Sequence, residues 1–422
     1  MYNSRRKINL FLMIRRAIQQ HALSSIITAI SVALGCGLVL AVWLIKIQSY
    51  QAFTGGAIGF DAVLGARGSQ LQLVLNTVFH LETSAGNIPW SLYKQIENDP
   101  RVRAAVPYAL GDNYYGYRIV GTSTQLFTHV DSLLIRNGRL FKENAPEAVV
   151  GHLVAKKMGL TVGAQIHPYH GLNFDLNAKH DQTYNIVGIL EPSNTPADRV
   201  IWIPIESVFR VEGHVLRGSG EIYRAESGQV IPDKHKEVSA VMLKLSSPQV
   251  GFFLDQMINK QGTVATIAWP IGKVMANLFD KIGWMNRVME MVAYLVMVVA
   301  GFAILAAIYN TINERQREFA IMRALGASRK LVFSVILFEA GTIALIGSFI
   351  GYLIYGLIFV VTTNIIQHRV GVVLDPLNLE GQGLIIVLIL PVATTMIGLL
   401  AGLVPAFKAY QTDVATNLIP RN

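Results

Sequence analysis

The side chains best suited to chemistry in this sequence are histidines. Six of them fall between residues 152 and 235: His152, His167, His170, His180, His214 and His235. Imidazole nitrogens bind zinc and other transition metals, so this cluster along the chain raises the possibility of a metal site. Pro168 argues against a helical i, i+3 pair in the His167–His170 run, and no carboxylate or thiol pattern completes a ligand set. We therefore expect solvated loop histidines and no metal site.

The sequence also lacks the motifs of nucleotide-binding and hydrolytic enzymes. The Gly272-Lys273 pair is followed by Val274 and does not complete a phosphate-binding loop, and the glycines at 55–59 have no lysine beside them. Neither Gly-x-Ser-x-Gly nor His-Glu-x-x-His occurs. We expect no catalytic residues and no cofactor bound by this chain.

The segment 313–330 has the most specific pattern of the chain. It combines charged side chains with good helix formers and predicts a short helix that ends at Gly326, a natural C′ residue, with Ser328 capping the next helix. Its apolar face has two adjacent stripes, formed by Phe319 and Met322, and by Ile321 and Leu325. An apolar face on so short a segment needs a partner, which indicates docking into a groove of another protein.

Four apolar stretches surround this segment and a large polar insert. They are Leu23–Ile45, Met291–Ile312, Ala340–Ile366 and Leu384–Phe407. None contains a charged side chain, and a helix of at least about 20 residues crosses the hydrocarbon core of a bilayer. The composition, 52% hydrophobic and 15% charged, is that of an integral membrane protein. The spans are divided one plus three by the insert.

Basic residues indicate the orientation. They gather before the first span and between the second and third: Arg5, Arg6, Lys7, Arg15, Arg16, Arg315, Arg317, Arg323, Arg329 and Lys330. By the positive-inside rule, both termini are cytoplasmic and the insert faces outward. The same distribution explains the net charge of +9 without a nucleic-acid surface. The residues at 8–14 suggest an amphipathic helix on the inner leaflet. The one cysteine, Cys36, lies in a span, so the insert has no disulfides.

The insert has mixed α and β patterns. Strand–helix–strand patterns at both of its ends predict one α+β core built from residues 46–120 and 237–273. The middle, 121–236, would be an inserted β-rich subdomain. The segment 274–290 is predicted to form a stalk helix with four apolar residues along one face: Val274, Leu278, Ile282 and Met285. This helix either runs into the second span or packs on the domain as a connector.

Small residues recur one turn apart within two spans. Gly347 and Gly351 lie in the third span, and Gly398 and Gly402 lie in the fourth. Glycines at this spacing let helices approach closely. We expect helix contacts at both pairs.

The chain resembles the MacB/FtsX-type permeases of mechanotransmission (type VII) ABC transporters. The resemblance rests on the run Arg317–Ser328 followed by Phe338-Glu339, on the one-plus-three layout, and on Val404-Pro405-Ala406. Three external segments extend it: 138–141, 147–151 and 198–204. The basic tail usual in that family is replaced here by Tyr410-Gln-Thr-Asp413.

This resemblance implies the layout of a bacterial inner-membrane permease subunit with a periplasmic core domain of MacB type. The expected parts are an amphipathic segment (1–22), transmembrane helices (23–45, 291–312, 331–366, 384–407), a periplasmic domain (46–290), a coupling loop (313–330), a periplasmic loop (367–383) and a cytoplasmic tail (408–422).

The resemblance also implies partners and a mechanism. A separate ATPase dimer would use ATP and Mg²⁺, with this docking set: Arg317, Glu318, Phe319, Ile321, Met322, Arg323, Leu325, Gly326, Ala327 and Ser328. A second permease chain, identical or related, would complete the assembly, together with membrane lipids and possibly a periplasmic adaptor, carrier or effector, which we expect at loops 167–182 and 212–236. The movement would export or extract a lipophilic, lipoprotein or peptide substrate. The alternative is signalling to a periplasmic partner such as a cell-wall hydrolase, without transport.

Overall fold

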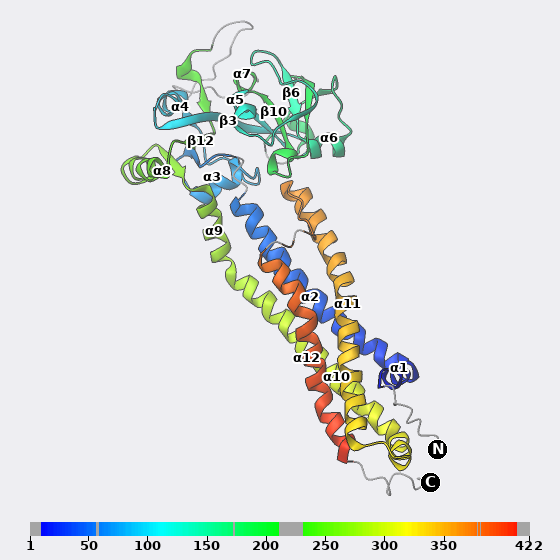
Figure 1. Cartoon of the computed structure of the whole chain (residues 1–422). Coiled ribbons are helices and arrows are strands. Elements are labelled where there is room, and N and C mark those ends of the chain that lie inside the picture. The colour runs from blue at the N-terminus through cyan, green and yellow to red at the C-terminus, as the bar shows by residue number, and fades with distance from the viewer. Residues whose placement is uncertain are drawn as a thin grey trace. The chain divides into compact units, whose positions relative to one another are not determined.

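The computed structural model describes residues 10–55, 59–171, 174–210, 231–377, 379 and 381–411 (Figure 1). The basic residues Arg5, Arg6 and Lys7, the loop around His214 and the chain beyond Gln411 lie outside these ranges. The chain divides into two compact units. The helical unit comprises Met1–Gln48, Gly283–Thr363 and Asp375–Asn422, and the α+β unit comprises Ser49–Ile282 and Asn364–Leu374.

The helical unit is built from long apolar helices and one short amphipathic helix. Its elements are α1 Leu10–Gln20, α2 Ala22–Gly55, α10 Gly283–Ala324, α11 Arg329–Val370 and α12 Gln382–Gln411. The last four, of 34, 42, 42 and 30 residues, are each long and apolar enough to cross a membrane. This confirms the predicted fold class of four spans, divided one plus three around an α+β domain.

Glycines bring three of these helices close together. A Cβ atom added at Gly347 would lie 2.7 Å from Val32 Cβ, and one at Gly351 would lie 2.8 Å from Cys36 Cβ, so α11 packs tightly on α2. A Cβ added at Gly398 would lie 2.5 Å from the Cβ of Ala344 on α11, and the next glycine along α12, Gly402, meets α11 in the same way. All four glycines therefore lie at helix contacts.

We expect Gly351→Val to separate α2 from α11 and to destabilise the protein by about 1–3 kcal/mol, the usual cost of overpacking. Gly356→Val is the matched control on the same helix, because a Cβ there meets no atom of the described residues within 4 Å. Thermal unfolding of both variants in detergent measures the difference. Equal melting temperatures for the two variants would show that the contact at Gly351 is loose.

The α+β unit is organised around one mixed sheet with the order β13-β1-β12-β3-β4-β10-β6-β9-β5, with β7 paired to β9 and β8 to β3. The strands are β1 Ala62–Ala66, β2 Ile88–Pro89, β3 Val102–Tyr114, β4 Tyr117–Thr122, β5 Ile135–Gly138, β6 Glu147–Val150, β7 Gln165–Ile166, β8 Tyr169–His170, β9 Tyr184–Leu190, β10 Val200–Pro204, β11 Glu237–Val238, β12 Ala240–Leu245 and β13 Ala265–Ala268.

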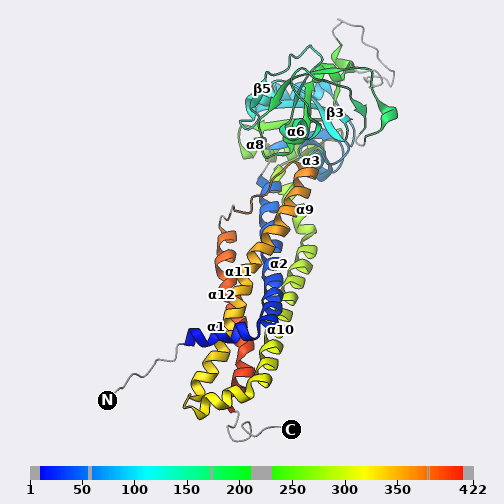
Figure 2. The same ribbon diagram turned by 90° about the vertical axis from the view of Figure 1, so that its right-hand side faces the viewer.

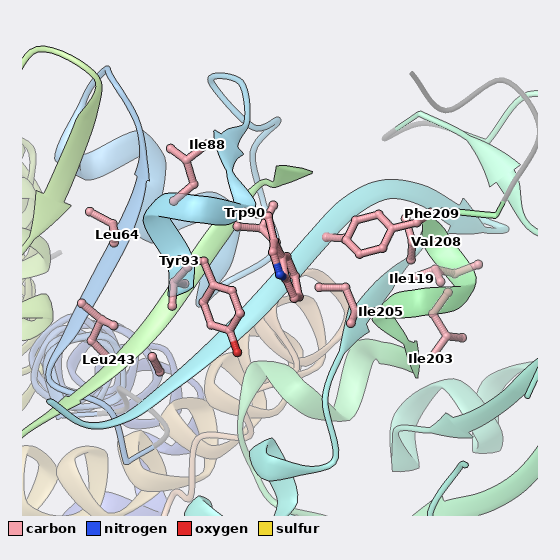
Figure 3. Packing of buried hydrophobic residues seen from close by; sticks show 14 of the residues in the cluster. Leu64, Ile88, Trp90, Tyr93, Ile119, Ile203, Ile205, Val208, Phe209 and Leu243 are labelled. Carbon is pink, nitrogen blue, oxygen red and sulfur yellow. The ribbon is translucent and has the colours of Figure 1, made fainter. Parts of the chain in front are cut away.

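Short helices and turns complete this unit. They are α3 Gln70–Thr77, α4 Trp90–Glu97, α5 Gln125–His129, α6 His152–Met158, α7 Ile205–Val208, α8 Pro248–Asp255 and α9 Ile271–Lys281, with 3₁₀ turns at Leu176–Ala178, Pro196–Arg199 and Asp233–His235 and a π-helical turn at Gln256–Gln261. Trp90, with its ring 4.6 Å from Tyr93 and 5.7 Å from Phe209, belongs to the buried cluster that includes side chains of the sheet strands (Figure 3).

The long strand β3 joins the two parts that the sequence had suggested. Its first half, from Val102 to Tyr108, pairs with β12, and its second half, from Ala109 to Tyr114, pairs with β4. The expected border at residue 120 falls inside β4. The proposed core and insert therefore share one sheet, because an unbroken strand has partners from both.

Two helical segments connect the α+β unit to the helical unit along the chain, and they differ in continuity. The end of α2 contacts α9 through aromatic rings: Phe279 lies 5.5 Å from Tyr50 and 5.8 Å from Phe53. While α2 is unbroken to Gly55, α9 ends at Lys281 and α10 begins at Gly283. The prediction of one stalk helix over 274–290 is wrong, because Ile282 leaves the helical conformation next to a glycine, which favours a helix end.

The four stalk residues are accordingly divided between two helices. Val274 is buried and Leu278 half-buried on α9, Ile282 is the C-cap, and Met285 is exposed on α10. The periodic face predicted from the sequence exists on α9 alone.

One buried histidine in this unit gives stability a pH dependence. Both ring nitrogens of His80 are buried without a hydrogen-bond partner among the described residues. Burial, together with the charges of Arg118 and Arg199, lowers the pKa of His80 to about 3. In the unfolded chain the pKa returns to about 6.5. Below that pH the unfolded state binds a proton that the folded state does not, so the free energy of unfolding falls as pH falls from about 6.5 towards 3.

We expect this slope to approach 1.4 kcal/mol per pH unit at most, the value for one proton. His80→Phe should flatten the dependence, because Phe keeps the edge-to-face contact with Trp202, whose ring lies 6.0 Å away, and does not titrate. Urea unfolding of the detergent-solubilised chain between pH 7 and 4, followed by tryptophan fluorescence, measures both slopes. Identical slopes would contradict the assignment to His80.

Candidate functional site

The turn between α10 and α11 has the geometry of a Schellman cap. Gly326 has a φ of +98°, and its N–H donates to Arg323 O over 3.0 Å while the Ala327 N–H donates to Met322 O over 3.0 Å. Ser328 Oγ accepts from the N–H of Leu331 over 3.2 Å at the start of α11. Both predicted caps are confirmed. The sequence encodes this turn locally, because only glycine adopts that φ without strain.

The charged segment before this turn is part of a longer helix. The prediction of a separate short helix within a loop at 313–330 is wrong: α10 continues to Ala324, and only Leu325–Ser328 lies between the two helices. Residues 313–324 contain neither glycine nor proline, so nothing in them ends the helix. Figure 2 shows the yellow end of α10 lying across the lower end of the helical unit.

The apolar face predicted for docking is divided between the interior and the surface. Phe319 is only 2% exposed and Met322 is partly buried, and both pack into the core of the helical unit. Ile321 is 44% exposed and Leu325 is 83% exposed. The expectation that all four would form one exposed face is therefore wrong for Phe319 and Met322, because both pack in a cluster with residues of α2, α11 and α12. The exposed pair, Ile321 and Leu325, lies one turn apart.

Polar and small residues surround this exposed pair. Arg317, Gly326 and Ser328 are exposed, and the half-buried residues are Glu318, Arg323 and Ala327. Arg329 and Lys330 are also exposed at the start of α11. The turn thus presents an apolar pair rimmed by positive charge, an arrangement suited to a protein groove with acidic edges.

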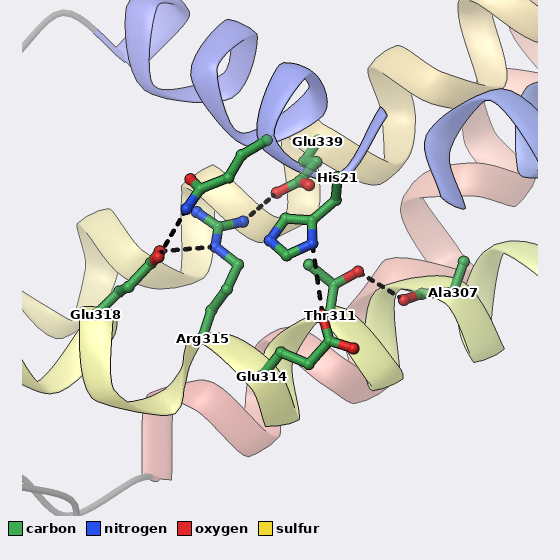
Figure 4. Close-up of polar contacts among 8 residues, drawn as sticks. His21, Ala307, Thr311, Glu314, Arg315, Glu318 and Glu339 are labelled. Carbon is green, nitrogen blue, oxygen red and sulfur yellow. Dashed lines mark hydrogen bonds and ion pairs between the residues drawn. The ribbon is translucent and has the colours of Figure 1, made fainter. Parts of the chain in front are cut away.

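A buried ion pair fixes the base of this turn (Figure 4). Arg315 Nη1 lies 3.2 Å from Glu339 Oε2, with both side chains less than a tenth exposed, and Arg315 Nε lies 3.2 Å from Glu318 Oε2. The Arg315 guanidinium also lies over the Phe319 ring, 5.0 Å from its centroid. Because α10 contributes Arg315 and α11 contributes Glu339, this pair joins the two helices on either side of the turn.

The end of α1 reaches the same network. Gln20 Nε2 donates to Glu318 Oε1 over 2.9 Å, and His21 Nδ1 lies 3.5 Å from Glu314 Oε2 (Figure 4). Sequence reasoning had used Arg315 only as a topology signal and Glu339 only as part of the family resemblance. The i, i+3 spacing of Arg315 and Glu318 was a local signal for the first contact, whereas Glu339 is 24 residues away.

A second polar cluster lies in the α+β unit and includes two of the six histidines. Asp112, His170 and His180 each offer one ligand atom, and these atoms lie within 4.8 Å of one another. The Asp112 carboxylate beside the imidazole raises the pKa of His180. The expectation of no metal site rested on the missing carboxylate, and the fold supplies one from β3. His167 does not join this group.

Four long apolar helices, one before and three after an α+β unit along the chain, define the architecture of a polytopic membrane protein. A family model described as the MacB-like periplasmic core domain matches residues 25–249, which is more than half of the 422 residues. Another, described as the FtsX-like permease C-terminal, matches residues 290–414. The chain therefore belongs to the MacB/FtsX-type permeases.

Individual proteins of similar sequence support this family assignment. The lipoprotein-releasing system transmembrane protein LolE of Haemophilus influenzae is 23% identical over 395 residues, covering 85% of this chain and 89% of LolE. LolC of the same organism is 24% identical, covering 84% of this chain and 87% of LolC. The probable export ATP-binding/permease protein MacB of Pseudomonas entomophila is 26% identical, covering 45% of this chain and 28% of MacB. The chain is an ABC-transporter permease of the bacterial inner membrane.

Proposed function

We propose that this permease transmits ATP-driven movement from a separate cytoplasmic ATPase to its α+β unit, and that this movement extracts a lipoprotein or another lipid-anchored substrate from the membrane. The observation that carries the coupling step is the exposed Ile321–Leu325 pair on a capped turn. In this proposal the turn, both termini and α1 face the cytoplasm, and the α+β unit faces the periplasm.

The structure of the turn supports its use as a docking element. Leu325, 83% exposed in the turn, offers an apolar contact to the groove of a partner, and the buried cores of interfaces are more apolar than the rest of the surface. The basic rim from Arg317, Arg329 and Lys330 would steer an acidic groove towards it. Arg315 and Glu339 would pass the movement of the turn to both helices, since each contributes one partner of the buried pair.

The relatives support the proposed substrate class. The match to LolE extends along 85% of this chain and includes both the helical and the α+β regions, whereas the match to MacB covers 45%. Two transmembrane proteins of one lipoprotein-releasing system are similar to this chain, which supports pairing with a second permease chain, identical or related. ATP and Mg²⁺ would then be bound by the ATPase dimer.

Reconstitution tests the proposal. The permease and its partner ATPase are placed in proteoliposomes with a fluorescent triacylated lipoprotein, and ATP is added with and without a periplasmic acceptor. Release of lipoprotein that depends on ATP hydrolysis supports extraction. ATP hydrolysis coupled to this chain without any release contradicts extraction and favours the signalling alternative.

A further inference from the structure

The cluster of Asp112, His170 and His180 has the geometry of a metal site, and strand register explains why. Asp112 on β3 lies directly opposite His170 on β8 in an antiparallel pair, so the two side chains share one face of the sheet. Tyr169 pairs with Lys179, which places His180 opposite Pro168, and the His180 N–H donates to Pro168 O over 2.9 Å. His180 is therefore the diagonal neighbour of His170 on that same face.

The distances fit a metal ion better than hydrogen bonds. One carboxylate oxygen, Asp112 Oδ1, lies 3.4 Å from His170 Nδ1 and 3.3 Å from His180 Nε2. A hydrogen bond from an N–H to oxygen is usually about 2.9 Å long. Two ligands held about 2.0–2.1 Å from a tetrahedral zinc ion are separated by about 3.3–3.4 Å. Both measured separations match that tetrahedral edge.

Burial also resembles that of an open metal site. The side chain of Asp112 is 5% exposed and that of His180 is 14% exposed, whereas that of His170 is 59% exposed. The two rings are nearly perpendicular, at 84° with centroids 5.6 Å apart, so their nitrogens can point at one centre without stacking. Three protein ligands with one solvent-facing side leave a fourth position for water, as in zinc sites with an open position.

We propose that Asp112, His170 and His180 bind one Zn²⁺ ion, with water as the fourth ligand. Two imidazoles and a carboxylate are a donor set that zinc accepts, and the carboxylate's charge partly offsets that of the ion. The ion would pin the segment from Gln165 to His180 onto β3, since one ligand comes from the strand and two come from that segment. This inference is independent of the proposed transport function.

The test uses the full-length chain without a histidine tag, stripped with a chelator in detergent and titrated with Zn²⁺. We expect one equivalent to bind, and Co²⁺ in the same position to give the intense visible bands of four-coordinate cobalt. His170→Ala and His180→Ala should each weaken Zn²⁺ binding at least about 100-fold, because loss of even an outer-shell partner costs about 10–100-fold.

His167→Ala is the matched control, because His167 lies three residues from His170 but is not among the three residues whose ligand atoms come together. It should bind Zn²⁺ as the parent chain does. Since His170 is largely exposed, its loss will not unfold the domain, and zinc should raise the melting temperature of the parent and the His167→Ala variant but not of His170→Ala. Failure of the stripped parent to bind Zn²⁺, equal weakening by all three variants, or uptake of Cu²⁺ but not Zn²⁺ would overturn the assignment.

Discussion

Leu325→Glu is expected to abolish the stimulation of the partner ATPase while membrane insertion and folding remain intact. The leucine is 83% exposed at the end of α10, so a carboxylate there meets water in the free permease but would be buried against the ATPase in the complex. Loss of a central apolar anchor costs at least about 2 kcal/mol of binding, or about 30-fold in affinity. Co-purification of the ATPase and its stimulated activity in nanodiscs measure both effects.

Leu377→Glu is the control for this substitution. Leu377 is 84% exposed, in the turn between α11 and α12, so the same change in charge and exposure occurs away from the proposed docking surface. Ile321→Glu should behave like Leu325→Glu with a smaller effect, because Ile321 is 44% exposed. Normal stimulation in Leu325→Glu would remove the docking role of the turn. Phe319 is unsuitable for such a test because its substitution would disturb the core of the helical unit.

Glu339→Leu is expected to destabilise the chain by about 3 kcal/mol, the low end of the cost of breaking a buried ion pair. The substitution leaves the Arg315 guanidinium, in a side chain 8% exposed, with Glu318 as its remaining carboxylate partner among the described residues. Reversible unfolding in mixed micelles measures this loss. The accompanying loss of ATPase coupling should be larger than that of Gly356→Val, which leaves the network intact.

The double variant Arg315→Leu/Glu339→Leu separates the ion pair from general packing. Replacing both charges by apolar side chains removes the uncompensated charge, so the double variant should recover most of the stability lost in Glu339→Leu. If the stability losses of Arg315→Leu and Glu339→Leu instead add up in the double variant, the two side chains contribute to stability independently. If the double variant regains stability but does not regain ATPase coupling, the ion pair contributes to the movement of the turn as well as to the stability of the fold.

The features that were predictable from the sequence are those with local causes. The span helices follow from uninterrupted apolar runs, and the cap at Gly326 follows from one residue type that tolerates its φ. The glycine pairs at 347–351 and 398–402 were also recognisable from spacing within one helix, although their partners on neighbouring helices were not.

The features that escaped prediction depend on contacts between distant residues. Phe319 and Leu325 are both apolar in the sequence, but only the packing of the helical unit decides that Phe319 is covered and Leu325 is not. The separation of Asp112 from His180 along the chain hides their proximity, which depends on the register of β8 with β3. The helix end at Ile282 was not predicted, because a single glycine such as Gly283 destabilises a helix only slightly and the surrounding contacts decide whether the helix ends there.

The unbroken strand β3 limits how chimeras of this permease can be designed. Exchanging only residues 121–236 with a relative would cut β4 and leave the half of β3 from Ala109 to Tyr114 facing a foreign edge. Each mismatched ladder position would leave backbone groups unpaired, so such a hybrid should misfold even if both parents are sound. An exchange that keeps the α+β unit whole would include both of its stretches, Ser49–Ile282 and Asn364–Leu374.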